Sequence, residues 1–167
     1  RRLFRLAMTR TDFGVAVCRA ALDQYIHDGL IPPRKGRVIH NGIRVDRFIP
    51  RDSRRRDALR TELGLEPGGP VVGTVGRLNP AKDQGRLVAA FSGIRQRHPD
   101  AILVIIGGGP LEAELREEIA RSGLEAAVFL LGDSDHVPEL LAGFDLFVLP
   151  SRTEGYSIAL LEAAAAH

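Results

Sequence analysis

The sequence predicts an α/β protein in which one parallel β-sheet is covered by helices on both faces. Four apolar runs, PVVGTVG, AILVIIG, AVFLLG and DLFVLP, recur between residues 70 and 150, and each is followed by a segment with helical character. The runs are continuous rather than alternating, which is typical of strands buried on both faces. Strands that alternate with helices join through right-handed crossovers, so we expect a Rossmann-like layered domain.

The first part of the chain predicts a smaller α/β segment. FGVAVC (13–18) and RVIH (37–40) have the composition of short strands, and residues 19–27 between them predict a helix. The pair Asn41-Gly42 predicts a turn that closes the second strand.

A charged, arginine-rich stretch separates this segment from the regular pattern. Residues 51–66 hold this stretch, with helical character near 56–63. We therefore expect the end of one domain at 1–50, a linker at 51–66, and a second domain at 67–167 that is incomplete at its C-terminus.

The four runs predict the strands of this second domain, at 70–76, 101–107, 127–132 and 145–150. Helices are expected at 80–98, 110–122 and 137–142, with a last one that opens near Tyr156. In such sheets ligands bind at the carboxyl ends of the strands. The candidate residues therefore follow the strands, at Gly76-Arg77, Gly107–Pro110, Gly132–His136 and Ser151–Gly155.

Composition limits the class of protein. The 167 residues are 44% hydrophobic and carry a net charge of +2, which fits a globular protein with a sizeable core. Residues 1–60 hold 15 Arg or Lys against 6 Asp or Glu, whereas residues 61–167 hold 8 against 15. A basic half can bind nucleic acid, but no aromatic residues are interleaved for base stacking. We therefore expect no nucleic-acid partner.

Cellular location follows from two further features. No apolar run approaches the roughly 20 residues that span a bilayer. The single cysteine, Cys18, excludes an internal disulfide and fits a reducing compartment, so we expect a cytoplasmic protein. The chain opens with Arg and its last helix has no stop signal, so we expect a piece of a longer protein.

The stretch VGRLNPAKD predicts an anion site. Arg77 follows a strand, and Asn79-Pro80 has the composition of a helix start, with Asn as the cap and Pro at the first position. Lys82 would then lie in the first helical turn, where the helix dipole disfavours a cation. Two cations beside free N–H groups suit a phosphate. The alternative is a lysine that extends into solvent beside Asp83.

Two other loops after strands are less specific. GGGP contains glycines that permit close approach of a ligand or of backbone, but it matches neither GxGxxG nor a P-loop. Asp133-Ser134-Asp135 forms a DxD pattern that can hold a divalent metal. Ser134 or Asp135 as a helix cap explains the same stretch without a metal, and we favour the cap.

The stretch SRTEGYSIALLEAAAAH places two glutamates around a second anion site. The backbone N–H groups of Tyr156, Ser157 and Ile158 would open a helix after Gly155. Glu154 precedes them and Glu162 lies deeper in the helix, where carboxylates can accept hydrogen bonds from sugar hydroxyls. A ligand that has a sugar, a phosphate group and a second sugar in that order would match this arrangement, and a nucleotide-sugar is such a ligand.

The segments GRLNPAKD, GGGPLEAEL, VFLLGDSDHVPELL and DLFVLPSRTEGYSIALLEAAAA together resemble one known family. They are similar to the nucleotide-binding domain of retaining GT-B glycosyltransferases of group 1, also called family 4. RVIHNGIRVDRFIP resembles the segment that leads from the acceptor domain of that family into its donor domain.

The resemblance implies a hexosyltransferase-type enzyme of glycan biosynthesis. It would transfer a sugar from a nucleotide-diphosphate-sugar to an acceptor with retention at the anomeric carbon. It implies no cofactor and no metal, and an acceptor that is a carbohydrate or is linked to a lipid, which is compatible with peripheral membrane contact of the parent protein. Most of the acceptor domain is absent from this sequence, so we expect the fragment alone to be inactive.

The resemblance also assigns roles to residues. Arg77 and Lys82 would neutralise the departing diphosphate, and Glu154 would contact the donor sugar; these three form the expected catalytic set. Glu162 would hold the ribose hydroxyls. The remaining donor-binding residues would be Gly76, Gly108, Asp133, Asp135, Gly155, Tyr156 and Ser157.

Four alternatives remain open from the sequence. One is a nucleotide-sugar epimerase of the same fold, and another is a non-catalytic nucleotide-sugar binding module. A third is a metal-dependent transferase that uses Asp133 and Asp135. A hydrolase with Ser157 as nucleophile is disfavoured, because GYSIA lies too far from its strand for a GxSxG elbow.

Overall fold

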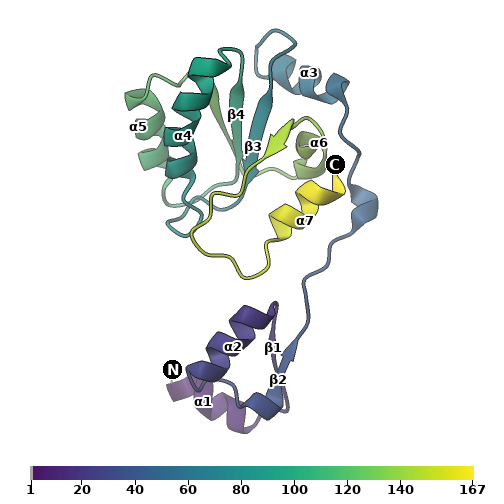
Figure 1. Cartoon of the computed structure of the whole chain (residues 1–167), viewed down its shortest axis with the longest axis vertical. Helices are drawn as coiled ribbons and strands as arrows, with labels where there is room; N and C mark the ends of the chain where they lie inside the picture. The colour runs from purple at the N-terminus through teal and green to yellow at the C-terminus, as the bar shows by residue number, and fades with distance from the viewer. Residues whose placement is uncertain (1) are drawn as a thin grey trace. The chain divides into compact units, whose positions relative to one another are not determined.

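The computed structural model describes residues 2–167, which fold into two compact units (Figure 1). The first unit comprises the N-terminal segment up to Ile43 together with Glu154–Ile158. The second comprises Arg44–Thr153 together with Ala159–His167.

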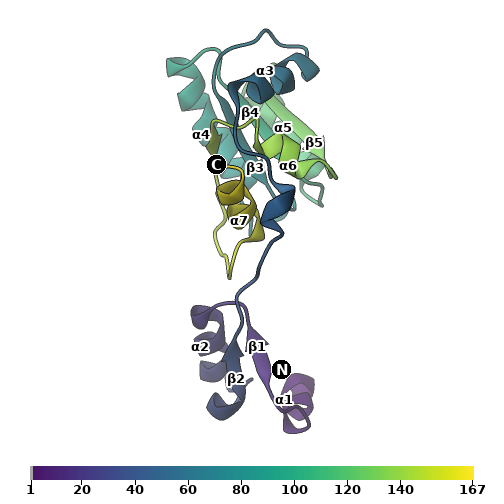
Figure 2. The ribbon, with the colours of Figure 1, turned by 90° about the vertical axis from the view of Figure 1, so that its right-hand side faces the viewer.

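The first unit contains two short parallel strands and two helices (Figure 2). Its elements are α1 (Arg2–Thr9), β1 (Gly14–Ala16), α2 (Arg19–His27), the 3-10 turn η1 (Pro33–Lys35) and β2 (Gly36–Val38). Met8, Ala16, Leu22 and Ile31 form a small buried cluster between them. The strands and the helix expected between residues 13 and 40 are confirmed, whereas the sequence analysis did not predict α1.

The second unit is built around a four-stranded sheet in the order β5-β4-β3-β6, with every neighbouring pair parallel. Its elements in chain order are η2 (Val45–Arg47), α3 (Ser53–Glu62), β3 (Val71–Val75), α4 (Gln84–Arg97), β4 (Ile102–Ile106), α5 (Glu112–Arg121), β5 (Val128–Gly132), α6 (Val137–Leu141), β6 (Leu146–Phe147) and α7 (Ile158–Ala165). The chain begins the sheet with β3, adds β4 and β5 on one side of it, and then places β6 on the other side. A crevice where the direction of winding reverses is the usual ligand site of such sheets.

Helices cover both faces of this sheet, and the side chains of its strands pack into two hydrophobic cores. On one face, Val72, Leu103 and Ile105 lie in a buried cluster with side chains of α4 and α5. On the other face, Val71 and Ile102 lie in a second cluster with side chains of α3, α6 and α7. Figure 1 shows α4 and α5 on one side of the strands and α6 and α7 on the other. The α/β fold with a parallel, doubly covered sheet is therefore confirmed, and it explains why the strands are apolar without alternation.

The stretch expected as a linker contributes a packed helix to the second unit. Helix α3 begins after Asp52, whose side chain accepts a hydrogen bond from the Arg54 amide at 2.9 Å. Leu59 is buried in the core, and the buried Arg60 donates hydrogen bonds to the carbonyl oxygens of Glu66 and Asp100. As a boundary between two domains, residues 51–66 remain a prediction.

The last strand is shorter than the expected range 145–150. Only Leu146 and Phe147 belong to β6, although the Val148 amide still donates to Gly73 O at 2.8 Å. Pro150 has no amide hydrogen to donate, so regular pairing cannot extend through it.

Candidate functional site

The candidate site is a pocket at the carboxyl ends of β3, β4 and β5. It has a volume of about 470 Å³, and it lies where the chain leaves each of these three strands. Its lining residues are Val75, Gly76, Arg77, Ile106, Gly107, Gly108, Gly109, Asp133, Ser134 and Val137. The sequence analysis had singled out the loops after these strands for this position.

Backbone hydrogen bonds hold the three loops of the pocket together. The Leu78 amide donates to Gly108 O at 2.9 Å, and the Gly107 amide donates to Gly132 O at 2.7 Å. Gly107 has a φ of 128°, and a β-carbon on it would stand 2.3 Å from Gly76 O. Only glycine allows so close an approach, so the glycine run fixes the spacing between the β3 and β4 loops.

The DSD loop contributes a carboxylate to this frame. Asp133 Oδ1 accepts a hydrogen bond from the Gly108 amide at 2.7 Å, and the Ser134 hydroxyl accepts one from the His136 amide at 3.1 Å. The preference for Ser134 or Asp135 as the cap of α6 was wrong, because His136 occupies the cap position and makes no side-chain cap bond. Across residues 2–167, no group of three or more His, Cys, Asp or Glu is placed to hold a metal ion.

Arg77 and Lys82 come together around Gly76. Arg77 is exposed and lines the pocket. The Cδ and Cε methylenes of Lys82 lie over Gly76, each 3.7 Å from where a β-carbon on that residue would stand. A lysine side chain therefore lies beside the pocket-lining Gly76, and a pocket-lining arginine directly follows that glycine in the chain.

The expected helix start at Pro80 was wrong, because α4 begins at Gln84. Asn79 Oδ1 accepts hydrogen bonds from the amides of Ala81 and Lys82, both at 3.1 Å, and so stabilises a separate turn. Asp83 then adopts a left-handed conformation with a φ of 52°, which keeps that turn out of the helix. Lys82 is consequently in a turn before α4 and not in its first helical turn.

A buried glutamine secures this turn to the strand. Gln84 is only 4% exposed, and its Nε2 donates to the carbonyl oxygens of Arg77 at 3.2 Å and Gly76 at 3.4 Å. The position of Arg77 thus depends on the first residue of α4. The sequence analysis missed Gln84, since nothing in its sequence neighbourhood indicates that the side chain turns back to the strand.

The Glu154–Ser157 stretch belongs to the first unit. The ring of Tyr156 stacks on His40, with centroids 4.9 Å apart, and the Asn41 side-chain amide donates to Tyr156 O at 3.2 Å. Gly155 lies beside Val17. The helix begins at Ile158, so Tyr156 and Ser157 precede its first residue.

Glu162 lies in α7 of the second unit, half-buried beside the core residue Ala163. Burial raises the pKa of the Glu162 carboxyl above its ordinary value, and the nearby Arg47 partly opposes this shift. A partly desolvated carboxylate has a strong tendency to accept hydrogen bonds from hydroxyl groups.

Comparison with known proteins identifies the family. The family described as "Glycosyl transferases group 1" matches residues 55–167. The chain belongs to the group 1 glycosyltransferases.

Two characterised relatives illustrate the similarity of this glycosyltransferase chain. A GDP-mannose-dependent alpha-(1-6)-phosphatidylinositol monomannoside mannosyltransferase of Mycobacterium tuberculosis is 36% identical over 98% of the chain and 41% of its own length. The Escherichia coli UDP-Gal:alpha-D-GlcNAc-diphosphoundecaprenol alpha-1,3-galactosyltransferase is 35% identical over 80% of the chain and 35% of its own length. The chain spans 33% to 41% of the length of the curated relatives that it matches.

Solved structures show the same fold. Anabaena HepE, crystallised with UDP and glucose, superposes with a TM-score of 0.84 at 27% identity, over 98% of this chain and 46% of HepE. The C-terminal domain of the group 1 glycosyltransferase LpcC from Francisella tularensis superposes with a TM-score of 0.64 at 25% identity, over 75% of this chain and 67% of that domain. Within residues 2–167 of the group 1 glycosyltransferase chain, every helix is too short or too polar to cross a bilayer.

Proposed function

We propose that the full-length protein transfers a hexose from a nucleotide-diphosphate-sugar to an acceptor, with retention at the anomeric carbon. The observation that carries the proposal is the arrangement around Gly76: Arg77 lines a pocket at the carboxyl end of a parallel sheet, and the Lys82 side chain lies beside Gly76, which lines the same pocket. Cations placed beside a leaving diphosphate stabilise the charge that develops as the glycosidic bond breaks.

The remaining residues of the proposed site would bind the rest of the donor. Glu162 would accept hydrogen bonds from ribose hydroxyls, and Glu154 would contact the transferred sugar. The backbone of Gly155, Tyr156 and Ser157 would approach the phosphates, while Gly76, Gly108, Asp133 and Asp135 would frame the nucleotide. Catalysis would depend on Arg77, Lys82 and Glu154.

The parts of the chain would then have distinct roles. Residues 1–50 would end an acceptor-binding domain, residues 51–66 would link the domains, and residues 67–167 would supply most of the donor-binding domain. UDP-galactose and GDP-mannose are the donors named for two relatives, and the diphosphate common to both suits the two cations. The lipid-linked acceptors named for the same relatives support an acceptor that is a carbohydrate or is carried on a lipid, reached from the cytoplasm by peripheral membrane contact.

The test compares donor turnover by the full-length protein and its Arg77→Ala and Lys82→Ala variants, using UDP-glucose, UDP-galactose and GDP-mannose. We expect each variant to lose about 100-fold in kcat/KM, the usual cost of removing one group that stabilises a leaving charge. Arg97→Ala is the matched control, because Arg97 lies at the C-terminal end of α4, away from the pocket.

Near-normal turnover by Arg77→Ala and Lys82→Ala would overturn the proposed roles. Activity that disappears with EDTA would instead favour a metal-dependent transferase. Release of free nucleotide without an acceptor would favour an epimerase, and donor binding without any turnover would indicate a binding module.

A further inference from the structure

An ion pair joins the two loops that flank the reversal point of the sheet. The loop after β3 leads to Asp83, and the loop after the neighbouring strand β6 leads to Arg152. Arg152 Nε lies 2.7 Å from Asp83 Oδ2, and Arg152 Nη2 lies 3.2 Å from Asp83 Oδ1. The two contacts make the pair bidentate, which fixes orientation as well as distance.

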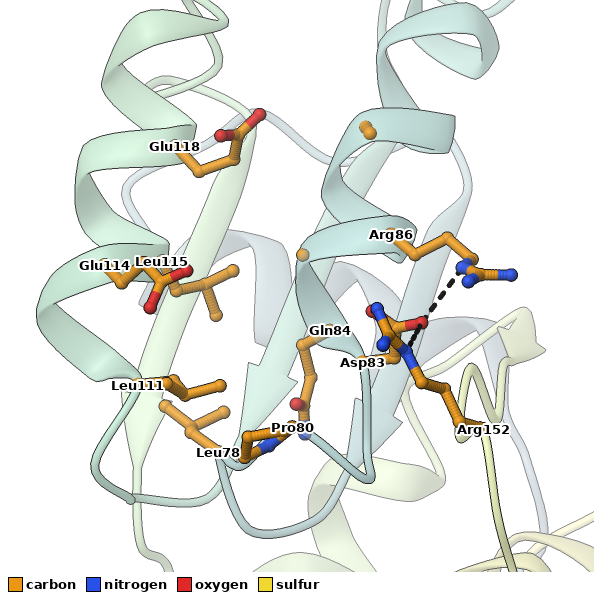
Figure 3. Close-up of a pocket in the computed structure, with 12 residues that line it drawn as sticks. Leu78, Pro80, Asp83, Gln84, Arg86, Leu111, Glu114, Leu115, Glu118 and Arg152 are labelled. Carbon is orange, nitrogen blue, oxygen red and sulfur yellow. Dashed lines mark hydrogen bonds and ion pairs between the residues drawn. The ribbon is translucent and has the colours of Figure 1, made fainter.

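A backbone hydrogen bond reinforces the same connection. The Arg152 amide donates to Ala81 O at 2.9 Å. The two loops are therefore joined through both the main chain and the side chain of one residue. Figure 3 shows the pair at the rim of a pocket of about 520 Å³ between α4 and α5.

Asp83 has a conformation that suits this role. Its φ of 52° makes it the one non-glycine residue with positive φ among residues 2–167. Its side chain is only 10% exposed, enclosed by Arg152 and by Arg86, whose Nε lies 2.9 Å from Oδ2. Asp tolerates the left-handed region better than most residues, so the site combines the required backbone with a carboxylate between two arginines.

The ion pair is adjacent in sequence to two residues that the proposed function assigns to donor binding. Lys82 directly precedes Asp83, and Glu154 follows Arg152 after one intervening residue. We propose that Asp83 and Arg152 form a clamp that holds the turn bearing Lys82 in place for the nucleotide-sugar. The clamp rests on the proposed function, and both of its members are positioning residues rather than groups that touch the donor.

Arg86 provides a matched control within the same cluster. It contacts the same carboxylate as Arg152, but from the first turn of α4, three residues away. Removing Arg86 therefore deletes a comparable ion pair without separating the two loops. A purely structural role of the Asp83 cluster would respond to the loss of either arginine.

The experiment measures binding of UDP-glucose and GDP-mannose to the full-length protein by calorimetry, for wild type, Arg152→Gln, Asp83→Asn, the double variant and Arg86→Gln. Asn keeps the left-handed backbone accessible at position 83. We expect Arg152→Gln and Asp83→Asn each to raise Kd by about tenfold, and the double variant to be no worse than either, as for residues that act as a unit. Arg86→Gln should bind like wild type.

Amide hydrogen exchange supplies a readout that needs no ligand. The Arg152 amide should exchange faster in Arg152→Gln and Asp83→Asn than in wild type or Arg86→Gln, by more than the change in the global free energy of unfolding accounts for. Wild-type affinity in Arg152→Gln, an equal loss in Arg86→Gln, or additive losses in the double variant would each overturn the clamp. A wild type that binds neither nucleotide-sugar would refute the proposed function, and the clamp with it, whereas binding that survives in every variant refutes the clamp alone.

Discussion

Replacing Gly107 by alanine tests whether close backbone contact sets the geometry of the pocket. The φ of 128° at this position lies outside the range that alanine prefers, which costs about 1–3 kcal/mol. The added β-carbon would stand 2.3 Å from Gly76 O. Relieving this overlap requires the β3 and β4 loops to separate, and such overpacking costs about 1–3 kcal/mol more. We therefore expect the free energy of unfolding to fall by about 3 kcal/mol.

Thermal and denaturant unfolding followed by circular dichroism measure this loss. In a chain of this size, about 3 kcal/mol corresponds to a fall of about 6–12 °C in Tm. Gly93→Ala is the control, because Gly93 lies inside α4 and a β-carbon there meets nothing within 4 Å; it should gain up to about 1 kcal/mol from helix propensity. A Gly107→Ala variant within about 0.5 kcal/mol of wild type would refute the reasoning, since that is the effect of an ordinary surface substitution.

Three further predictions concern the carboxylates. Burial raises the pKa of Glu162 above 4.5, so the folded state penalises the ionised carboxylate and the free energy of unfolding should fall as pH rises above that value. The Glu162→Gln variant should lose this pH dependence in denaturant titrations. At pH 7 it should be more stable than wild type without ligand, and it should bind nucleotide more weakly. The Arg152 guanidinium lowers the pKa of Asp83 below 3.8. The Asp83 carboxylate therefore stabilises the folded protein above that pH, and this contribution is lost as pH falls through the folded pKa. The difference in free energy of unfolding between wild type and Asp83→Asn should accordingly shrink on acidification. Asp133→Ala removes the acceptor of the Gly108 amide and should reduce nucleotide affinity by about fivefold, the value of one hydrogen bond, in calorimetry.

The sheet could be predicted from the sequence because its physical requirement is local. A strand buried on both faces needs apolar side chains at every position, and Ile102–Ile106 meets that requirement without interruption. The loops that line the pocket could be predicted in the same way, since they directly follow the predicted strands and contain glycines and charged residues. Periodicity and turn composition were sufficient for these features.

The start of α4 could not be predicted in the same way. Asn79-Pro80 suits a helix cap, but the same Asn side chain can stabilise an isolated turn, and the choice depends on the left-handed backbone of Asp83. The clamp was missed because its partners are 69 residues apart. The role of the glycine run was also hidden, because Gly107 is constrained by Gly76, which reaches it only through the pairing of β3 with β4.

The backbone frame of the pocket has a consequence for how such a site can change over evolution. The bonds from Leu78 to Gly108 and from Gly107 to Gly132 join main-chain atoms only, so most substitutions at a rim position such as Ser134 leave them intact. Mutations that alter ligand preference can then accumulate around the opening without a matching loss of stability. Selection on specificity and selection on folding act on largely separate residues in this part of the chain.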